Sequence, residues 1–499
     1  MESQSKQIVQ KLWSYCNILR DDGLSYPDYV EQLTYLLFLK MADEKAQVSS
    51  NRPSIIPIGS DWQSLVSRHG RDLHTQYGAI LEKLQNETGM LGTIFYKAEN
   101  KIRNPAKLEI IVYDLINKKN WSALDIDVKG EAYEGLLEKN AQDTKTGAGQ
   151  YFTPRPIINA IVQCIRPQLG ETIYDPACGT GGFLLAAHEY ISKTNPKLTK
   201  EQSEFLKLKT FRGVELVHTV TRLGAMNLLL HGIGPEYDEE GELPIVTADS
   251  LIEDEGVKCN VLLTNPPFGR KSSVTTINEL GERERQTIDA IRFDFIVSTS
   301  NKQLNFLQHI RTALMDKGRA AVVVPDNVLF EGGAGESIRR QLLYDFNVHT
   351  LLRLPAGIFY AQGVRTNVLF FDNDTSKDKP ATKELWVYDL RTNMHFTLRT
   401  KRLEYSDLEE FIKCYSSENY HSRKATWSNS TPNGRWRPYS YNDLIKREKC
   451  NLDIFWLEDE SYQSLENLPD PDIITAEITD DLRAALAQLE EIQSDFVMR

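Results

Sequence analysis

The chain has 499 residues, 41% of them hydrophobic and 26% charged, which is typical of a globular protein with two to four domains. No stretch approaches the roughly 18 consecutive apolar residues of a membrane span, and the first residues lack the apolar segment of a signal peptide. The sequence therefore predicts a cytoplasmic protein without a membrane partner.

The charged residues sum to a net charge of −12, which disfavours unaided binding of nucleic acid, because Lys and Arg provide most of the affinity for phosphates. A nucleic-acid substrate would therefore require a partner that supplies basic surface. The six cysteines include no C-x-x-C pair, so neither a zinc site nor a disulfide framework is expected. They are interpreted as small buried hydrophobic residues.

Residues 1–145 are predicted to form a helical bundle domain. Apolar side chains recur at helical spacing between Ile8 and Leu19, and an apolar segment at residues 29–41 follows a helix start signal at residues 25–28. This region carries no recognisable catalytic constellation, so its expected role is packing or docking.

A polar, glycine-bearing stretch at residues 142–149 marks the boundary of a second predicted domain, residues 146–400. Short apolar segments alternate there with helical ones, which predicts a mostly parallel, doubly wound α/β sheet. The last two of these segments are expected to pair as an antiparallel hairpin at the edge of the sheet. The predicted strands are residues 172–174, 210–214, 261–263, 320–324, 348–352 and 366–371.

Polar residues follow the expected strands, and in such sheets ligands bind beside the carboxyl ends of the strands. The first strand leads into a glycine-rich turn at residues 175–184 that opens a helix, where glycines let a ligand approach the backbone and the helix N-terminus favours an anionic group. Glu215 follows the second strand and is suited to ribose hydroxyls, and Asp249 follows a third and is suited to an adenine amino group. Each has a plainer interpretation as a turn, a surface residue or a helix cap, but their order along the chain predicts one nucleoside-binding crevice.

The next strand ends at the turn Asn265-Pro266-Pro267-Phe268, on which the functional interpretation depends most. Two prolines remove two backbone N–H donors, which leaves carbonyl acceptors without competing donors. Together with the side-chain oxygen of Asn265 and the flat ring of Phe268, they suit a planar ring that carries an exocyclic amine. Acceptors on the hydrogens of that amine would make its nitrogen a better nucleophile, and no metal is needed. The plainer interpretation is an ordinary proline turn.

At these residues the chain resembles the amino-methyltransferases that use S-adenosylmethionine, and specifically the modification subunit of Type I restriction-modification systems. Three segments carry the resemblance: residues 149–154, the glycine-rich turn and the turn at Asn265. Their order along the chain is that of the gamma class of adenine N6 methyltransferases. Residues 354–359 and 451–454 also resemble that subunit, and the match covers nearly the whole chain.

The resemblance implies a Rossmann-like methyltransferase sheet, S-adenosylmethionine as the cofactor, and methyl transfer to adenine N6 of a base flipped out of double-stranded DNA. It implies that the side-chain oxygen of Asn265 and the carbonyl of Pro266 accept the two N6 hydrogens while Phe268 stacks on the base. The expected catalytic residues are Asn265, Pro266, Pro267 and Phe268, the expected cofactor-binding residues are Tyr151, Phe152, Thr153, Pro154, Asp175, Ala177, Gly179, Thr180, Gly181, Glu215 and Asp249, and no metal ligand is expected.

Residues 401–499 are assigned to a C-terminal extension. Apolar residues recur every three or four positions between Ile474 and Phe496, which predicts a helix over about 471–499 that packs on its own domain or docks on a partner. No segment is large and basic enough to be a separate target-recognition domain. The remaining expected elements are a strand at residues 384–390, a capped helix at residues 406–412 and a mobile polar loop near the DNA at residues 270–301.

The resemblance also supplies the expected partners. They are double-stranded DNA, a separate specificity subunit that chooses the target, at two modification subunits to one specificity subunit, and a restriction subunit as an optional third partner. Two alternatives stay open. The same turn would serve a self-sufficient gamma-class methyltransferase that acts on adenine N6 or cytosine N4, and it would equally serve an amino group of an RNA base or of a protein glutamine. In the other alternative the chain acts mainly as a scaffold of the complex.

Overall fold

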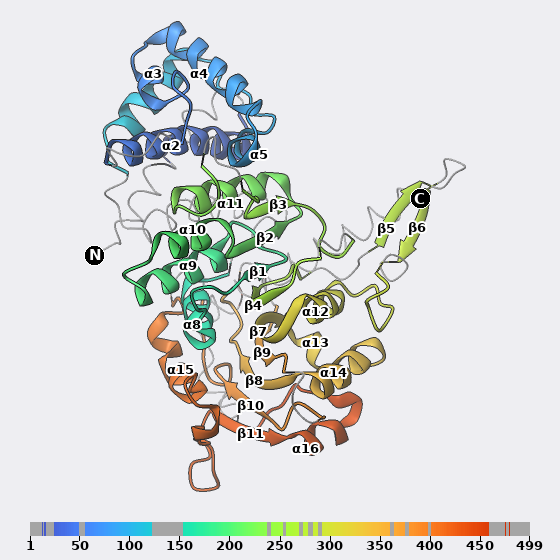
Figure 1. Ribbon diagram of the computed structural model, residues 1–499. Coiled ribbons are helices and arrows are strands. Elements are labelled where there is room, and N and C mark those ends of the chain that lie inside the picture. The colour runs from blue at the N-terminus through green and yellow to red at the C-terminus, as the bar shows by residue number, and fades with distance from the viewer. Residues whose placement is uncertain are drawn as a thin grey trace. The chain divides into compact units, whose positions relative to one another are not determined.

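The computed structural model describes residues 12, 14–15, 24–48, 55–121, 153–236, 241–252, 256–268, 292–359, 364–374, 379–397, 401–458, 475 and 479, with the backbone of residues 273–277 and 283–287 (Figure 1). The chain divides into two compact units. The first unit contains Met1–Phe152 and Pro167–Thr264, and the second contains Thr153–Arg166 and Asn265–Arg499. The expected division into three domains stays a prediction.

The N-terminal part of the first unit is helical, as expected. The helix predicted over residues 29–41 is longer at both ends, and its first turn is capped by the hydroxyl of Ser25, which accepts from the Asp28 amide at 3.3 Å. Asn104 caps a second helix in the same way, by accepting from the Ala106 amide at 3.0 Å. The helices here are α2 (Tyr26–Val48), α3 (Trp62–Val66), α4 (Gly70–Gln85), α5 (Gly89–Phe95), α6 (Pro105–Glu109) and the π-helical η1 (Ile110–Asn117).

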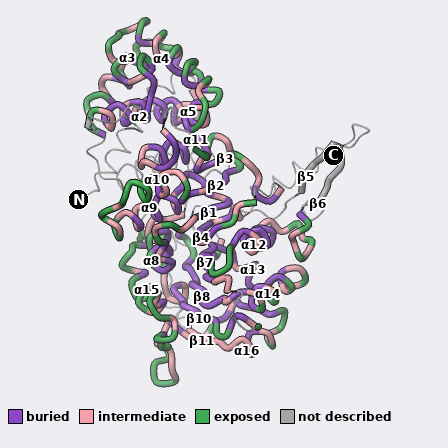
Figure 2. The backbone as a smooth tube through the Cα atoms, viewed as in Figure 1, coloured by how far each residue is buried: buried purple, intermediate pink, exposed green. Residues whose placement is uncertain are grey.

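The rest of the first unit is a parallel α/β sheet, which confirms the expected architecture. Its strands lie in the order β4-β1-β2-β3, all parallel, so their carboxyl ends meet at one edge. Figure 2 shows β1, β2 and β4 largely buried, as parallel strands covered by helices are, whereas only Ile245 of β3 is buried. The elements are β1 (Ile173–Asp175), α9 (Gly182–Thr194), α10 (Lys200–Leu208), β2 (Phe211–Glu215), α11 (His218–Leu230), β3 (Ile245–Thr247) and β4 (Cys259–Thr264).

The second unit contains the helix α8 (Arg155–Ile165) and a mixed sheet in the order β11-β10-β8-β9-β7. The strands are β7 (Leu314–Pro325), β8 (Asn347–Arg353), β9 (Thr366–Asp372), β10 (Glu384–Asp389) and β11 (Trp436–Ser440). The helices that accompany them are α12 (Lys302–Ala313), α13 (Asp326–Phe330), α14 (Ala334–Asp345), η4 (Tyr405–Leu408), α15 (Glu409–Tyr415), η5 (Tyr420–Ser422), α16 (Tyr441–Lys446) and η6 (Glu448–Cys450).

The antiparallel pairing of β8 with β9 is confirmed, but its expected place at the edge of the sheet is wrong. β9 lies between β7 and β8 and is antiparallel to both. β10 then pairs in parallel with the other side of β8, and β11 pairs antiparallel with β10. The edge therefore moves to β11, because β10, the next strand after β9, satisfies the backbone groups that β8 would otherwise leave open, and β11 in turn pairs with β10.

The polar segment expected to be a mobile loop contains regular structure. Its residues form the antiparallel strands β5 (Ser273–Ile277) and β6 (Arg283–Thr287), and β5 is rich in the β-branched residues that favour strands. Further on, the side chain of Gln308 donates to the Val297 carbonyl and accepts from the Val297 amide, both at 3.0 Å. The expectation of a loop is therefore wrong for residues 273–277 and 283–287, whereas residues 292–301 form neither helix nor strand.

Several expectations fall on residues that are not described. The boundary at residues 142–149 lies outside the described residues, as does nearly all of the helix expected over about 471–499. Within the described part of the chain, no helix is long and apolar enough to cross a membrane. The same residues contain no group of three His, Cys, Asp or Glu side chains placed to hold a metal ion.

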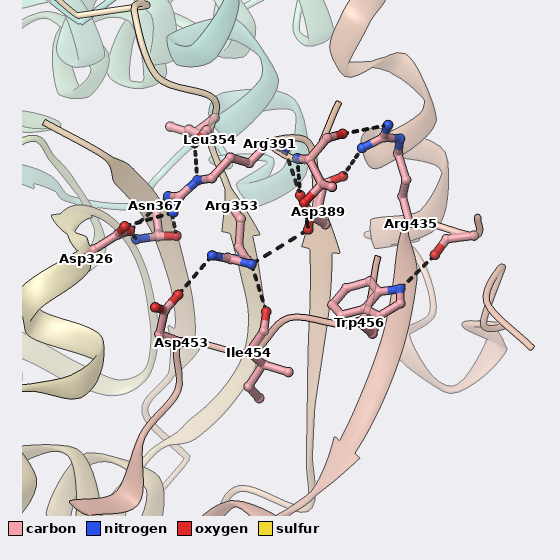
Figure 3. A network of polar contacts seen from close by, with 12 residues as sticks. Asp326, Arg353, Leu354, Asn367, Asp389, Arg391, Arg435, Asp453, Ile454 and Trp456 are labelled. Atoms are coloured by element: carbon pink, nitrogen blue, oxygen red, sulfur yellow. Dashed lines mark hydrogen bonds and ion pairs between the residues drawn. The ribbon is translucent and has the colours of Figure 1, made fainter. Parts of the chain in front are cut away.

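A buried polar network joins the end of β8 to a segment about 100 residues later (Figure 3). Arg353 is fully buried and donates to the Ile454 carbonyl at 2.8 Å and to the Asp453 carboxylate at 2.9 Å. The Asp389 carboxylate, also fully buried, lies 3.6 Å away, and the Phe455 ring covers the guanidinium at 4.0 Å. This network fastens the C-terminal segment to the sheet.

We expect Arg353→Met to lower the free energy of unfolding of the second unit by about 3 kcal/mol, because the substitution leaves a buried carboxylate without its cation. Urea denaturation followed by tryptophan fluorescence measures the change. Arg340→Met is the matched control, since Arg340 is exposed and pairs with Glu336 on the surface of α14. Its loss is expected at about 0.5 kcal/mol or less, and equal losses for the two variants would contradict the prediction.

Candidate active site

The turn between β1 and α9 is shaped by two glycines. Asp175 ends β1 and is 1% exposed, and its carboxylate accepts from the Ala177 amide at 3.1 Å. Gly179 and Gly181 have φ values of +56° and +83°, which residues with a side chain rarely adopt. The chain can thereby fold back on itself and enter α9 with backbone N–H groups facing outward at the helix N-terminus.

Two side chains from neighbouring elements hold this turn. Asn227 on α11 donates to the Thr180 carbonyl at 3.1 Å. Ser250, just after β3, donates to the Pro176 carbonyl at 2.6 Å. Cys178 is buried within the turn, which fits the interpretation of the cysteines as small buried hydrophobic residues. The turn is therefore preformed by the protein itself.

Glu215, at the end of β2, is linked directly to the glycine-rich turn. The side chain is 5% exposed, and its two oxygens accept from the Val217 amide at 2.8 Å and from the Gly179 amide at 3.1 Å. Each carboxylate oxygen retains a second lone pair, so the group can still accept from a diol. The adjacent Leu216 was not predicted as a site residue, although it is 57% exposed and offers apolar surface beside the acid.

The two acids differ in their electrostatic setting. Burial raises the pKa of Asp175 to about 7, with the nearby charge of Glu215 as a smaller cause. Burial also raises the pKa of Glu215, against the lowering effect of its backbone N–H donors. A cationic group placed beside Asp175 would therefore interact with a carboxyl group that gains or loses its proton near neutral pH.

Asp249 occupies the position that follows β3. Its carboxylate accepts from the Leu251 amide at 3.0 Å, and its carbonyl accepts from the Ile252 amide at 3.0 Å, so it closes a turn. The plainer interpretation of Asp249 as a helix cap is not supported, because no helix lies between β3 and β4 among the described residues. Its predicted contact with an adenine amino group stays a prediction.

In the second unit, Asn265 presents a buried acceptor. Its Nδ2 donates to the Thr153 hydroxyl at 2.9 Å, which fixes the plane of the amide. Its Oδ1 is buried and has no hydrogen-bond partner among the described residues. A buried acceptor without a donor is costly, and such groups mark places where a ligand supplies the missing hydrogen.

The rest of the turn is held by two residues that the sequence did not single out. Gln303 is 5% exposed and donates from Nε2 to the Pro267 carbonyl at 3.1 Å. Phe359 meets the Phe268 ring edge-on, with ring centroids 6.0 Å apart and planes at 88°. Phe359 belongs to a segment quoted for the family resemblance, whereas Gln303 reads only as a polar residue at the start of a helix.

The predicted site residues fall into two groups. In the first unit, Asp175, Ala177, Gly179, Thr180, Gly181 and Glu215 come together around the glycine-rich turn, and Asp249 follows the neighbouring strand β3. In the second unit, Thr153 contacts Asn265, and Pro154 is the N-terminal cap of α8. Tyr151 and Phe152 lie outside the described residues. The predicted roles of all these residues stay predictions.

Comparison with known proteins places the chain in a family. Residues 124–448 match the N-6 DNA Methylase family model, and residues 8–118 match the HsdM N-terminal domain model. The methylase subunit of the Type I restriction enzyme StySJI from Salmonella typhimurium is 38% identical over 98% of this chain and 95% of its own length. The EcoKI methylase subunit from Escherichia coli is 37% identical over the same shares.

Solved structures agree with these matches. The crystal structure of the EcoKI M protein covers 98% of this chain and 96% of its own, at 34% identity and a TM-score of 0.53. A modification subunit of a putative type I restriction enzyme from Vibrio vulnificus covers 92% and 97%, at 26% identity and a TM-score of 0.69. The expected Rossmann-like methyltransferase fold is thereby confirmed. The chain belongs to the N-6 DNA methylase family, as a Type I modification subunit whose cofactor is S-adenosylmethionine and whose methyl acceptor is adenine in DNA.

Proposed function

We propose that Asn265 and Pro266 bind the N6 amino group of a flipped adenine and that a separate specificity subunit chooses the DNA sequence. The observation that supports the first part is the buried Asn265 Oδ1, to which no described residue donates although its amide nitrogen is fixed. An exocyclic amine has two hydrogens, and this oxygen with the adjacent Pro266 carbonyl would accept both.

The two acceptors would act by positioning. Hydrogen bonds to both amine hydrogens orient the nitrogen lone pair away from the base plane and toward the electrophile, so catalysis rests on orientation and fixed dipoles. Phe268 would stack on the extruded base, with Phe359 holding its ring edge-on. Gln303 keeps the Pro267 carbonyl occupied, so the turn cannot rotate without breaking that bond.

The first unit fits the cofactor in three ways. When bound, S-adenosylmethionine supplies a methyl group activated by a sulfonium. Asp175 and the N–H groups around Gly179 and Gly181 would hold its amino and carboxylate ends, and Glu215 would accept from its ribose hydroxyls. Asp249, with the exposed Leu216, would contact its adenine. Two features support this assignment: the left-handed backbone at Gly179 and Gly181, and the buried carboxylates that hydrogen bonds already hold in place.

DNA and the other subunits of a restriction-modification complex are the partners of this subunit. We propose in addition that two copies of this chain join one specificity subunit, with the segment at about 471–499 as the docking helix and with a restriction subunit as an optional third component. The net charge of −12 supports a partner that contributes basic surface. The cytoplasmic location stays a prediction.

Methyl transfer from labelled S-adenosylmethionine to duplex DNA tests the dependence on a specificity subunit. The chain is assayed alone and together with the specificity subunit encoded beside it. Transfer only in the mixture supports the proposal. Sequence-specific transfer by the chain alone would mean a self-sufficient methyltransferase.

Asn265→Ala removes the buried acceptor, and we expect kcat to fall about 100-fold or more, as when a fixed transition-state partner is lost. Asn265→Asp keeps an acceptor oxygen and is expected to retain more activity. Calorimetry should find the same cofactor Kd for both variants within about twofold, because Asn265 is not among the residues assigned to the cofactor. Wild-type turnover by Asn265→Ala would contradict the assignment of Asn265 as an acceptor of the amine hydrogens.

Thr153 either holds the Asn265 amide or contacts the cofactor directly, and the variants Thr153→Val and Thr153→Ser separate these two roles. The valine variant keeps the shape but loses the hydroxyl that holds the Asn265 amide, so kcat is expected to fall about tenfold, the worth of one hydrogen bond. The serine variant keeps the hydroxyl and should remain close to wild type. A higher cofactor Kd with an unchanged kcat at saturating cofactor would instead support the direct cofactor contact predicted from the sequence.

The raised pKa of Asp175 predicts pH-dependent cofactor binding. The ammonium group of the cofactor needs the carboxylate form, which is lost as pH falls through the pKa of about 7. We therefore expect calorimetric affinity to rise from pH 6 to about 7.5 and then to level off, with a change of up to about tenfold per pH unit below the pKa. Asp175→Asn should bind more weakly with a flat profile over this range, and a flat wild-type profile would contradict the prediction.

A further inference from the structure

Arg222 is a buried charged residue that joins the N-terminal helices to the cofactor-binding sheet. It lies on α11 and is 5% exposed. One guanidinium nitrogen contacts the Glu31 carboxylate on α2, and the other donates to the Tyr96 carbonyl, just after α5, at 2.8 Å. The guanidinium also lies 5.1 Å from the centre of the Tyr35 ring. The helix α11 is thus held by residues of α2 and by the backbone just after α5.

A second contact lies one turn earlier on the same helix. His218 begins α11, and its ring meets the Tyr96 ring edge-on with centroids 4.4 Å apart. Its Nδ1 is 3.0 Å from the Thr247 hydroxyl at the end of β3. Only two residues separate His218 from Glu215, so the N-terminal helices touch the chain next to the predicted ribose-binding acid.

The opposite side of α11 presses against the glycine-rich turn. A Cβ atom on Gly224 would lie 3.1 Å from the Gly179 carbonyl and 2.6 Å from a methyl group of Ile245, so the helix has no room to move closer. Asn227 adds its hydrogen bond to the Thr180 carbonyl at 3.1 Å. A displacement of α11 would therefore displace the glycine-rich turn or break its contacts with the helix.

We propose that Arg222 is a positioning residue for the cofactor. Through its contacts with Glu31 and the Tyr96 carbonyl, the N-terminal helices hold α11 against the glycine-rich turn. This inference rests on the cofactor residues assigned under the proposed function. Without Arg222 the Glu31 carboxylate keeps Lys101, at 2.8 Å, as a cationic partner, but α11 loses its ion pair with α2 and its hydrogen bond to the Tyr96 carbonyl. Because coupling is reciprocal, cofactor binding should in turn strengthen the docking of the N-terminal helices.

Arg222→Met tests the proposal through cofactor binding by the full chain without DNA. Calorimetry with S-adenosylmethionine should give a Kd about tenfold higher, within the usual range of coupling between sites. The kcat at saturating cofactor, with DNA and the specificity subunit present, should stay within about twofold. Glu31→Gln should raise Kd in the same direction, and the double variant should bind no more weakly than Arg222→Met alone, because both act through one contact.

Arg339→Met is the matched control for the loss of a buried arginine. Arg339 is 2% exposed and donates to the carbonyls of Val328, Glu331, Lys449 and Cys450, all within the second unit. It should lower the melting temperature without changing the cofactor Kd. An unchanged Kd in folded Arg222→Met, or an equal rise in Arg339→Met, overturns the proposal.

Two further variants cover the cases in which Arg222→Met does not fold or the assigned cofactor site is wrong. If Arg222→Met does not fold, Arg222→Lys retains the charge but loses the forked geometry, and it should still raise the cofactor Kd. An unchanged Kd in folded Arg222→Lys and Glu31→Gln then overturns the proposal. Glu215→Gln distinguishes this failure from a failure of the assigned site, because it must weaken cofactor binding if Glu215 holds the ribose, whatever Arg222 does.

Discussion

The hydrogen bond from the Gly179 amide to the Glu215 carboxylate joins the ends of two neighbouring parallel strands. A parallel sheet places such ends side by side, but it does not connect the loops that follow them. Here a buried acid makes that connection, and the left-handed backbone at Gly179 and Gly181 lets the turn reach it. The side chains of Asn227 and Ser250 then fix the same turn from α11 and from the end of β3.

The second unit meets a different requirement, which is to keep an acceptor free. Prolines remove competing backbone donors around Asn265, and the Thr153 hydroxyl occupies its amide nitrogen. The Asn265 oxygen is buried and accepts no hydrogen bond from the part of the chain that the structure describes. Gln303 and Phe359 brace the turn from α12 and from the segment after β8. The local stability lost by an unpaired oxygen is offset by contacts around it, a common property of functional sites.

The sequence predicted those parts of the site whose residues lie close together in the chain. The turn at Asn265, the glycines after β1 and the acid after β2 each depend on residues close together in the chain, so their order and type suffice. Gln303 and Arg222 could not be found this way, because their partners lie far away: Arg222 and Glu31 are 191 positions apart. The same holds for the place of β9, since nothing in residues 366–371 shows that β10 will cover the other side of β8.

The Arg353 network sets the order in which the units can be completed during synthesis. All residues of the first unit have been made once Thr264 leaves the ribosome, whereas α8 must wait for Arg319, which donates to the Ile165 carbonyl. Arg353 must wait longer still, because the partners it needs beyond Asp389 are at positions 453 and 454. A chain stopped shortly before them contains every expected catalytic and cofactor residue, yet it buries a guanidinium with too few partners. Late premature termination should therefore abolish the enzyme through misfolding rather than through loss of its chemistry.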